Sequence, residues 1–83
     1  MNPHNRVIIL RMNPDQHWKV QTNPSWSSSE HHCNQLLHND ANDYVEYQNC
    51  GVKHRMIRFR DLGQYDIKKS EVKPEWLLDP TGS

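Results

Sequence analysis

Residues 26–38 are the stretch that most restricts how this chain can fold, because no other segment has a start, a helical face and a stop. Ser27 and Glu30 have the spacing of a capping box, in which a hydroxyl and a carboxylate bond the free amides of a helix start. Trp26 precedes this cap and can fold over it as a hydrophobic staple. We expect a helix over residues 28–38 that ends at the polar residues after it.

The expected helix has one narrow apolar stripe. Cys33, Leu36 and Leu37 lie at i, i+3 and i+4, so they share one face. His31 and His38 project to the opposite side, toward solvent. A helix with a single stripe is expected to cover one face of a sheet.

Asn-Pro pairs mark turns before, between and after two candidate strands, at Asn2-Pro3, Asn13-Pro14 and Asn23-Pro24. Residues 6–12 are apolar at consecutive positions, which predicts a central strand buried on both faces. Residues 17–22 alternate apolar and polar side chains, which predicts a half-buried strand. A turn over residues 13–16 joins the two strands into a hairpin.

A second hairpin follows the helix. Residues 44–48 form one short strand and residues 52–60 its partner, joined by a tight turn over residues 49–51. Alternation in the second strand places Ile57 and Phe59 on one face, and its arginines at even positions on the other.

The remaining residues predict short elements and a tail. Residues 61–64 make a turn, residues 65–67 a brief strand, and Pro74 can start a short helix that carries Trp76. We expect an ordered core over about residues 5–68 and a tail over residues 69–83, with Trp76 docked on the core or free for a partner.

These elements predict a single α+β domain over residues 1–83. Its order is β-β-α-β-β, with one helix packed on one face of a small antiparallel sheet. The chain has 83 residues and a hydrophobic fraction of 34%, which indicates a thin core that self-association or a protein partner would complete.

Composition limits the location and the partners of the protein. The net charge of +0 gives no overall attraction to nucleic acid or anionic membrane. No apolar run is long enough to span a bilayer, and the N-terminus lacks the apolar region of a signal peptide. With two cysteines, the chain is not a disulfide-rich scaffold. We expect a cytoplasmic protein with reduced thiols and no membrane contact.

Positive charge is concentrated in the last predicted strand. Residues 52–60 carry four cations and no acid, whereas residues 30–51 carry four acids and no Lys or Arg. The candidate ligands for a single-stranded nucleic acid or RNA are Lys53, Arg55, Arg58, Phe59 and Arg60. An alternative is that these cations protect an edge strand from aggregation. Glu46 can also pair with one of them across the hairpin.

Histidine and cysteine give weak signals for chemistry. No Cys-x-x-Cys or His-x-x-x-His pair is present, so we expect no metal site and no cofactor. Cys50 and His54 flank a turn, and of the cysteines and histidines they most resemble a catalytic nucleophile with its general base. A small ribonuclease using His54 and the neighbouring cations is the third hypothesis, and no catalytic residue is assigned.

The leading hypothesis is a small, non-enzymatic protein-binding or accessory module, either a monomer or a homodimer. Such single-domain proteins are often encoded by phages or other mobile elements. The contact surface would be a sheet edge or one of the exposed aromatic residues, Tyr44, Tyr47, Phe59 or Trp76. Binding of single-stranded nucleic acid through residues 53–60 is the alternative.

Overall fold

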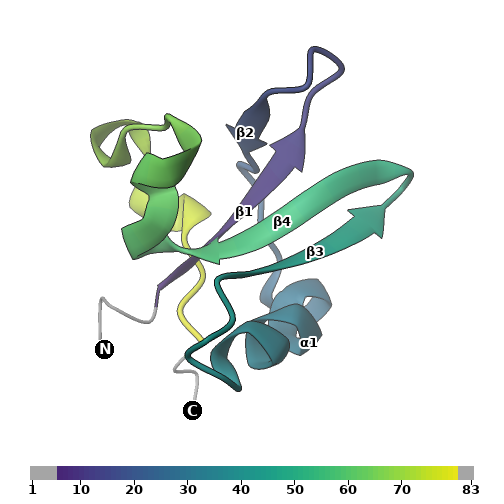
Figure 1. Ribbon diagram of the computed structural model, residues 1–83, viewed down its shortest axis with the longest axis vertical. Helices are drawn as coiled ribbons and strands as arrows, with labels where there is room; N and C mark the ends of the chain where they lie inside the picture. Colours follow the sequence, from purple (N-terminus) through teal and green to yellow (C-terminus); the bar gives the residue numbers. More distant parts are fainter. Residues whose placement is uncertain (1–5, 81–83) are drawn as a thin grey trace.

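The computed structural model describes residues 6–80, and an antiparallel sheet of four strands forms the frame of this region. The strands are β1 (Val7–Met12), β2 (Trp18–Val20), β3 (Tyr44–Asn49) and β4 (Val52–Arg58). Helix α1 (Trp26–Leu37) lies between β2 and β3 in the chain, so the expected order β-β-α-β-β is confirmed. In space the order is β2-β1-β4-β3, which puts β2 and β3 at the edges (Figure 1).

Strand β1 is central, as its run of apolar residues predicts. Val7 to Leu10 are all buried, on both faces of the sheet. Strand β4 is also central, because it pairs with β1 through Ile8↔Ile57 and with β3 through Tyr44↔Ile57. The alternative that the basic strand is a protected edge is therefore wrong.

Helix α1 begins two residues earlier than expected. Ser25 is the residue at the cap, and its side chain makes no capping hydrogen bond to the helix. Ser27 and Trp26 lie inside the helix, so the predicted capping box is wrong. The predicted stripe is correct: Cys33 and Leu36 are fully buried against the sheet, and His31 on the other side is exposed.

Apolar clusters fill both faces of the sheet. The cluster under α1 contains Val7, Ile9, Cys33, Leu36, Met56 and Leu78. The cluster on the opposite face contains Ile8, Leu10, Ile57 and Leu62. Alternate residues of β1 and β4 supply both clusters, as the period of two in a strand requires.

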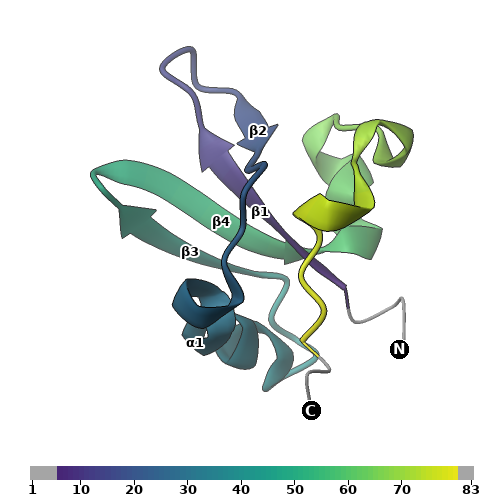
Figure 2. The ribbon, with the colours of Figure 1, turned by 180° about the vertical axis from the view of Figure 1, so that it is seen from behind.

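The opposite face is covered by residues 59–80, which we call the C-terminal arm (Figure 2). The arm contains three 3-10 helices, Phe59–Tyr65, Lys69–Glu71 and Pro74–Trp76. The predicted helical turn at Pro74 is confirmed. The strand predicted at residues 65–67 is wrong, because Asp66 has a left-handed backbone (φ 59°) that ends the first of these helices.

The arm closes against the start of the sheet. Leu78 exchanges two backbone hydrogen bonds with Val7, at 2.8 and 3.0 Å, and its side chain is 6% exposed. Val72 and Leu77 pack on the face opposite α1. The turn expected at Asn2-Pro3 and the last part of the expected tail, residues 81–83, lie outside the described residues.

Both hairpin turns have left-handed residues. Cys50 (φ 54°) and Gly51 (φ 79°) form a two-residue connection between Asn49 and Val52, as type I′ turns require. Gln16 (φ 67°) is left-handed in the first hairpin, where its backbone amide donates to the backbone carbonyl of Asn13 at 2.8 Å.

Candidate functional site

Arg58, a predicted nucleic-acid ligand, is used inside the protein. Arg58 is 3% exposed, and its guanidinium donates to the backbone carbonyls of Leu36 (3.1 Å) and Asn42. The Leu36 carbonyl is in the last turn of α1, where carbonyls lack helical partners. Arg58 therefore holds the end of the helix and the following loop to the sheet.

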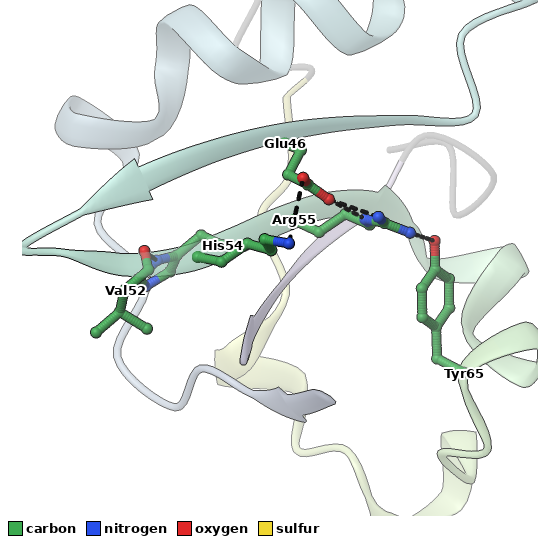
Figure 3. A network of polar contacts seen from close by, with 6 residues as sticks. Glu46, Val52, His54, Arg55 and Tyr65 are labelled. Carbon is green, nitrogen blue, oxygen red and sulfur yellow. Dashed lines mark hydrogen bonds and ion pairs between the residues drawn. The ribbon is translucent and has the colours of Figure 1, made fainter. Parts of the chain in front are cut away.

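Arg55 lies on the face of the sheet opposite α1, where aromatic residues surround it and polar contacts hold it. Figure 3 shows its polar contacts to Glu46 and Tyr65. Its guanidinium donates to the Glu46 carboxylate at 3.0 Å from Nε and to the Tyr65 hydroxyl at 3.4 Å. It also lies 4.0 Å from the ring centre of Tyr44 and 4.9 Å from that of Trp18. Burial alone would lower the pKa of Arg55, but the hydrogen bonds to Tyr65 and Glu46 raise it above the usual value.

The other predicted ligands do not form one surface. Lys53 is exposed and reaches Glu46 at 3.9 Å, and Arg60 is exposed and reaches Asp61 at 3.7 Å. Phe59 is partly buried against the cluster opposite α1. The hypothesis of nucleic-acid binding stays a prediction. Lys53→Glu with Arg60→Glu is its informative test, because Arg58→Glu would bury an unpaired carboxylate.

Trp76 borders a hollow that separates β2 from the C-terminal arm. The hollow measures about 450 Å³, within the range of ligand pockets. Its apolar walls are Trp18, Val20, Ile67, Val72 and Trp76, and its polar residues are Arg11, Lys19, Thr22 and Glu71. Trp76 is thus a predicted site residue that the structure places at a cavity with apolar walls.

A second hollow, about 460 Å³, shares Trp18 and Ile67 with the first. Its remaining walls are more polar and include Gln16, His17 and Asp66. We call the two hollows together the β2 groove, because they run beside that edge strand and meet at Trp18 and Ile67. Gln16 and Asp66 both have left-handed backbones, which non-glycine residues adopt at a cost.

The edge of β2 presents free backbone groups beside the groove. The Asn13 amide donates to the His17 carbonyl at 2.9 Å, and the Gln21 amide donates to the Ile9 carbonyl at 2.8 Å. Odd-numbered residues of this segment therefore bond to β1, and the amides and carbonyls of Trp18 and Val20 point outward. Within residues 6–80 these outward groups have no backbone partner.

Positive charge lies at the rim of the groove. Arg11 and Lys19 are both exposed, and neither forms an ion pair with a described residue. Glu71 is the acidic residue of the apolar hollow. At the apolar hollow the two cations therefore outnumber the one carboxylate, whereas Asp66 is the acidic residue of the second hollow.

A stack of aromatic rings lies on the helix side of the sheet. Tyr47 stacks between His32 (ring centres 3.9 Å apart) and His54 (5.4 Å apart). Burial raises the pKa of Tyr47 to about 12, with a further contribution from the Cys33 thiol. Burial also raises the pKa of Cys33 to about 11, with a contribution from Glu30. Cys33 is therefore a protonated, buried thiol at neutral pH.

The residues proposed for an enzyme come together only in part. Cys50 and His54 line one hollow of about 360 Å³ with Arg11. The His54 ring is buried, with Nδ1 2.8 Å from the Val52 carbonyl, and the Cys50 thiol has the Asn49 carboxamide as its partner at 3.6 Å. Among residues 6–80, no three His, Cys, Asp or Glu side chains are grouped so as to hold a metal ion.

No helix in the described part of the chain has the length and apolar character needed to cross a membrane. Comparison with models of protein families, with curated proteins and with solved structures finds no match for this chain.

Sequence reasoning found half of the groove. The alternation of Trp18 and Val20 with polar residues predicted a half-buried strand. It did not predict that the C-terminal arm of the same chain would lie beside this strand. Ile67 and Val72 are isolated apolar residues in polar surroundings, and no periodicity links them to Trp18. Their common position depends on the path of the C-terminal arm.

Proposed function

We propose that this protein is a binding module that takes an extended segment of another protein along the β2 groove. The observation that carries this proposal is the position of an apolar hollow directly beside an edge strand with outward-facing backbone groups. Edge strands bind extended peptides through their main chain, and neighbouring pockets select side chains. The β2 groove offers both features.

The walls of the groove favour a bulky apolar side chain in the partner. Trp18 and Trp76 are both partly buried and border the hollow from different segments of the chain. Aromatic residues that line a pocket commonly contribute most of the binding energy of an interface. Val20 and Val72 also line the hollow and add to its apolar surface.

The rim of the apolar hollow favours an acidic residue in the partner, next to the apolar one. Arg11 and Lys19 lie at the edge of the hollow, and the residues described here give them no acidic partner. Charges at the rim of an interface act mainly on association rate and on selectivity. The partner is therefore an extended segment with a large apolar side chain and one or more carboxylates.

Selection of random eight-residue peptides displayed on phage, followed by calorimetry, tests this function. We expect enriched peptides with a bulky apolar residue near Asp or Glu. Trp76→Ala should weaken their binding at least about tenfold, because it removes a wall of the pocket. Tyr44→Ala is the matched control, since Tyr44 is 46% exposed on the opposite edge strand. Enrichment of no sequence, or equal effects of the two variants, contradicts the proposal.

The contribution of the edge can be tested separately. Val20→Pro removes an outward amide without removing a hydrogen bond to β1, whereas Val20→Ala removes only side-chain contacts. Peptide binding should fall further in Val20→Pro than in Val20→Ala. Equal affinities of the two variants would exclude the main-chain contact. Sedimentation at increasing concentration shows whether a second copy of the chain, instead of another protein, fills the groove.

A further inference from the structure

Three basic side chains stand in a row across neighbouring strands of the sheet. The register pairs Lys19 of β2 with Arg11 of β1, and Arg11 in turn with His54 of β4. Residues directly opposite one another in antiparallel strands share a face. Met56, two residues along β4 from His54, belongs to the cluster beneath α1, so the row lies on the helix side of the sheet.

The row borders a hollow at the hairpin end of this face. The hollow measures about 360 Å³. Among the residues described, neither α1 nor any Asp or Glu contributes to its lining. Its polar lining consists of Arg11, His54, Thr22 and the carboxamide residues Gln21, Asn23 and Asn49. The hollow is therefore basic and rich in hydrogen-bonding groups.

The charges of the row favour an anion over water as the occupant. Arg11 and Lys19 are both exposed, and neither forms an ion pair within residues 6–80. Like charges directly opposite one another on paired strands destabilise the pair. An anion beside Arg11 would offset this repulsion, which a neutral water molecule cannot do.

The His54 ring is held in place with one nitrogen left for a ligand. Nδ1 lies 2.8 Å from the Val52 carbonyl, which only accepts, so this nitrogen carries a proton (Figure 3). Tyr47 stacks on the ring with centres 5.4 Å apart. Nε2 has no hydrogen-bond partner among the described residues, and it is not one of the unpartnered atoms that are closed off from solvent.

The imidazole favours a phosphate monoester over a carboxylate. An oxygen of the anion bonds to Nε2 only with a proton between the two atoms, because both otherwise accept. A phosphate monoester has its second pKa at about 6, so it can share such a proton near neutral pH. A carboxylic acid loses its proton at about pH 4. The charge of about −2 on the ester also matches the two cations, Arg11 and Lys19.

The rest of the lining favours hydroxyl groups beside the phosphate. Thr22, Asn23 and Asn49 are exposed, and their side chains both donate and accept hydrogen bonds. No aromatic side chain of the described residues lines the hollow, so a nucleobase would have no stacking partner there. The volume lies within the range of small-ligand pockets.

We propose that this hollow binds a sugar phosphate, with the phosphate between Arg11 and His54 and the sugar hydroxyls beside Asn49. The site shares Arg11 with the rim of the β2 groove. It lies on the helix side of the sheet, however, and does not rest on the function proposed for that groove.

A titration followed by ¹H–¹⁵N NMR at constant ionic strength tests the proposal, with ribose 5-phosphate as the probe. We expect saturable shifts at the backbone amides of Asn23, Asn49 and His54. Ribose, which lacks the phosphate, and acetate, which carries a single charge, should each bind at least about tenfold more weakly. Equal affinity for ribose or for acetate, or the absence of a saturable shift, overturns the proposal.

Two further probes test the choice of a sugar phosphate. Inorganic phosphate should bind more weakly than ribose 5-phosphate, because it has no sugar hydroxyls. Adenosine 5′-monophosphate should bind no more tightly than ribose 5-phosphate, because the described lining has no ring on which the base could stack. The opposite order in either comparison overturns this choice of ligand.

Variants localise the binding. Arg11→Met removes an exposed cation and should weaken binding of ribose 5-phosphate at least about tenfold. Lys53→Met is the matched control, since Lys53 is an exposed cation whose partner Glu46 lies on the opposite face of the sheet. Trp76→Ala should also leave this binding unchanged, because Trp76 lines the β2 groove. Unchanged affinity in Arg11→Met, or an equal loss in either control, overturns the site.

Proton uptake tests the role of His54. Calorimetry near pH 7 in buffers of different ionisation enthalpy should show that ribose 5-phosphate binding takes up protons. His54→Asn keeps a donor for the Val52 carbonyl but has no Nε2, so the uptake should disappear.

The other titratable groups at His54 provide the controls. Burial raises the pKa of the stacked Tyr47 to about 12, so its hydroxyl stays protonated near pH 7, and Arg11 keeps its charge throughout. Cys50 also lines the hollow, and Cys50→Ser should leave the uptake unchanged. No uptake by the unmodified protein, or uptake that persists in His54→Asn, overturns the contact between the phosphate and His54.

Discussion

Arg58 shows how one arginine can serve the fold in a strand whose sequence suggests a binding surface. Its side chain donates hydrogen bonds to the carbonyls of Leu36 and Asn42, while exposed Arg60 is two residues further along the chain. Both arginines contribute equally to the net charge. Only the partners that surround them in space distinguish their roles.

We predict that Arg58→Met lowers the free energy of unfolding by about 2–4 kcal/mol, because the buried carbonyl of Leu36 and the partly buried carbonyl of Asn42 lose their donor. Arg60→Met should change it by less than about 0.5 kcal/mol, as is usual for exposed sites. Urea unfolding measures both values. Similar stabilities of the two variants would show that the Arg58 contacts do not hold the helix end.

Ionisation of the Cys33 thiol makes the free energy of unfolding depend on pH in the alkaline range. Burial raises its pKa from 9.0 to about 11, so between these values the unfolded chain loses the proton first. The free energy of unfolding therefore falls as pH rises through this window, by up to about 3 kcal/mol. Below pH 9 the contribution of the protonated Cys33 thiol to the free energy of unfolding is fully present.

We predict that Cys33→Ser removes the slope between pH 9 and 10, below the range in which Tyr47 adds its own, because a serine hydroxyl does not ionise there. Cys50→Ser is the matched control and should keep the slope, since Cys50 is exposed. Unfolding by urea at pH 8, 9, 10 and 11 measures the effect. A slope that persists in Cys33→Ser would assign it to other groups, such as Tyr47, whose pKa is also raised.

At the scale of elements, the sequence predicted the parts that have their own pattern. The apolar run in β1 required cover on both faces, and the stripe of α1 required a sheet. The position of β4 could not be read in the same way. Its cations suggested solvent, yet Arg55 and Arg58 point to opposite faces and each meets partners from distant segments.

The turn between β3 and β4 is a local element whose sequence determines its geometry. Gly51 (φ 79°) has no neighbouring atom within 4 Å of an added Cβ, so strain in the backbone is the whole cost of a side chain. We predict that Gly51→Ala lowers the free energy of unfolding by about 1 kcal/mol.

Gly63→Ala is the control, because Gly63 also has open space around it and has no left-handed backbone. Thermal unfolding of both variants decides the point. A loss in Gly63→Ala equal to that in Gly51→Ala would rule out backbone strain as the cause.

At the scale of the whole molecule, the C-terminal arm completes the sheet. It covers the face opposite α1 and supplies Leu78 to the cluster beneath α1, so it joins the two clusters. Its 3-10 helices are too short for a repeated apolar pattern, which is why the sequence predicted a turn, a brief strand and a tail with one helical turn at Pro74. The β2 groove depends on the path of the arm, so it could not be predicted from the sequence either.

We predict that Leu78→Ala lowers the free energy of unfolding by about 2–4 kcal/mol, as for other buried leucines. Val52→Ala, at a residue that is 37% exposed, should cost less than about 1 kcal/mol. Chemical denaturation compares them. If Leu78→Ala were as mild as the control, the arm would not be part of the core.

Hydrogen exchange at β2 tests the central claim, that this edge and its groove bind an extended segment. In the free protein, the outward amides of Trp18 and Val20 should exchange fast, and the amide of Lys19, which faces β1, should exchange slowly. A saturating selected peptide should slow Trp18 and Val20 at least about tenfold and leave the β3 amides of Glu46 and Gln48 unchanged. Unchanged exchange at Trp18 and Val20, or protection that appears at β3 instead, would contradict the account.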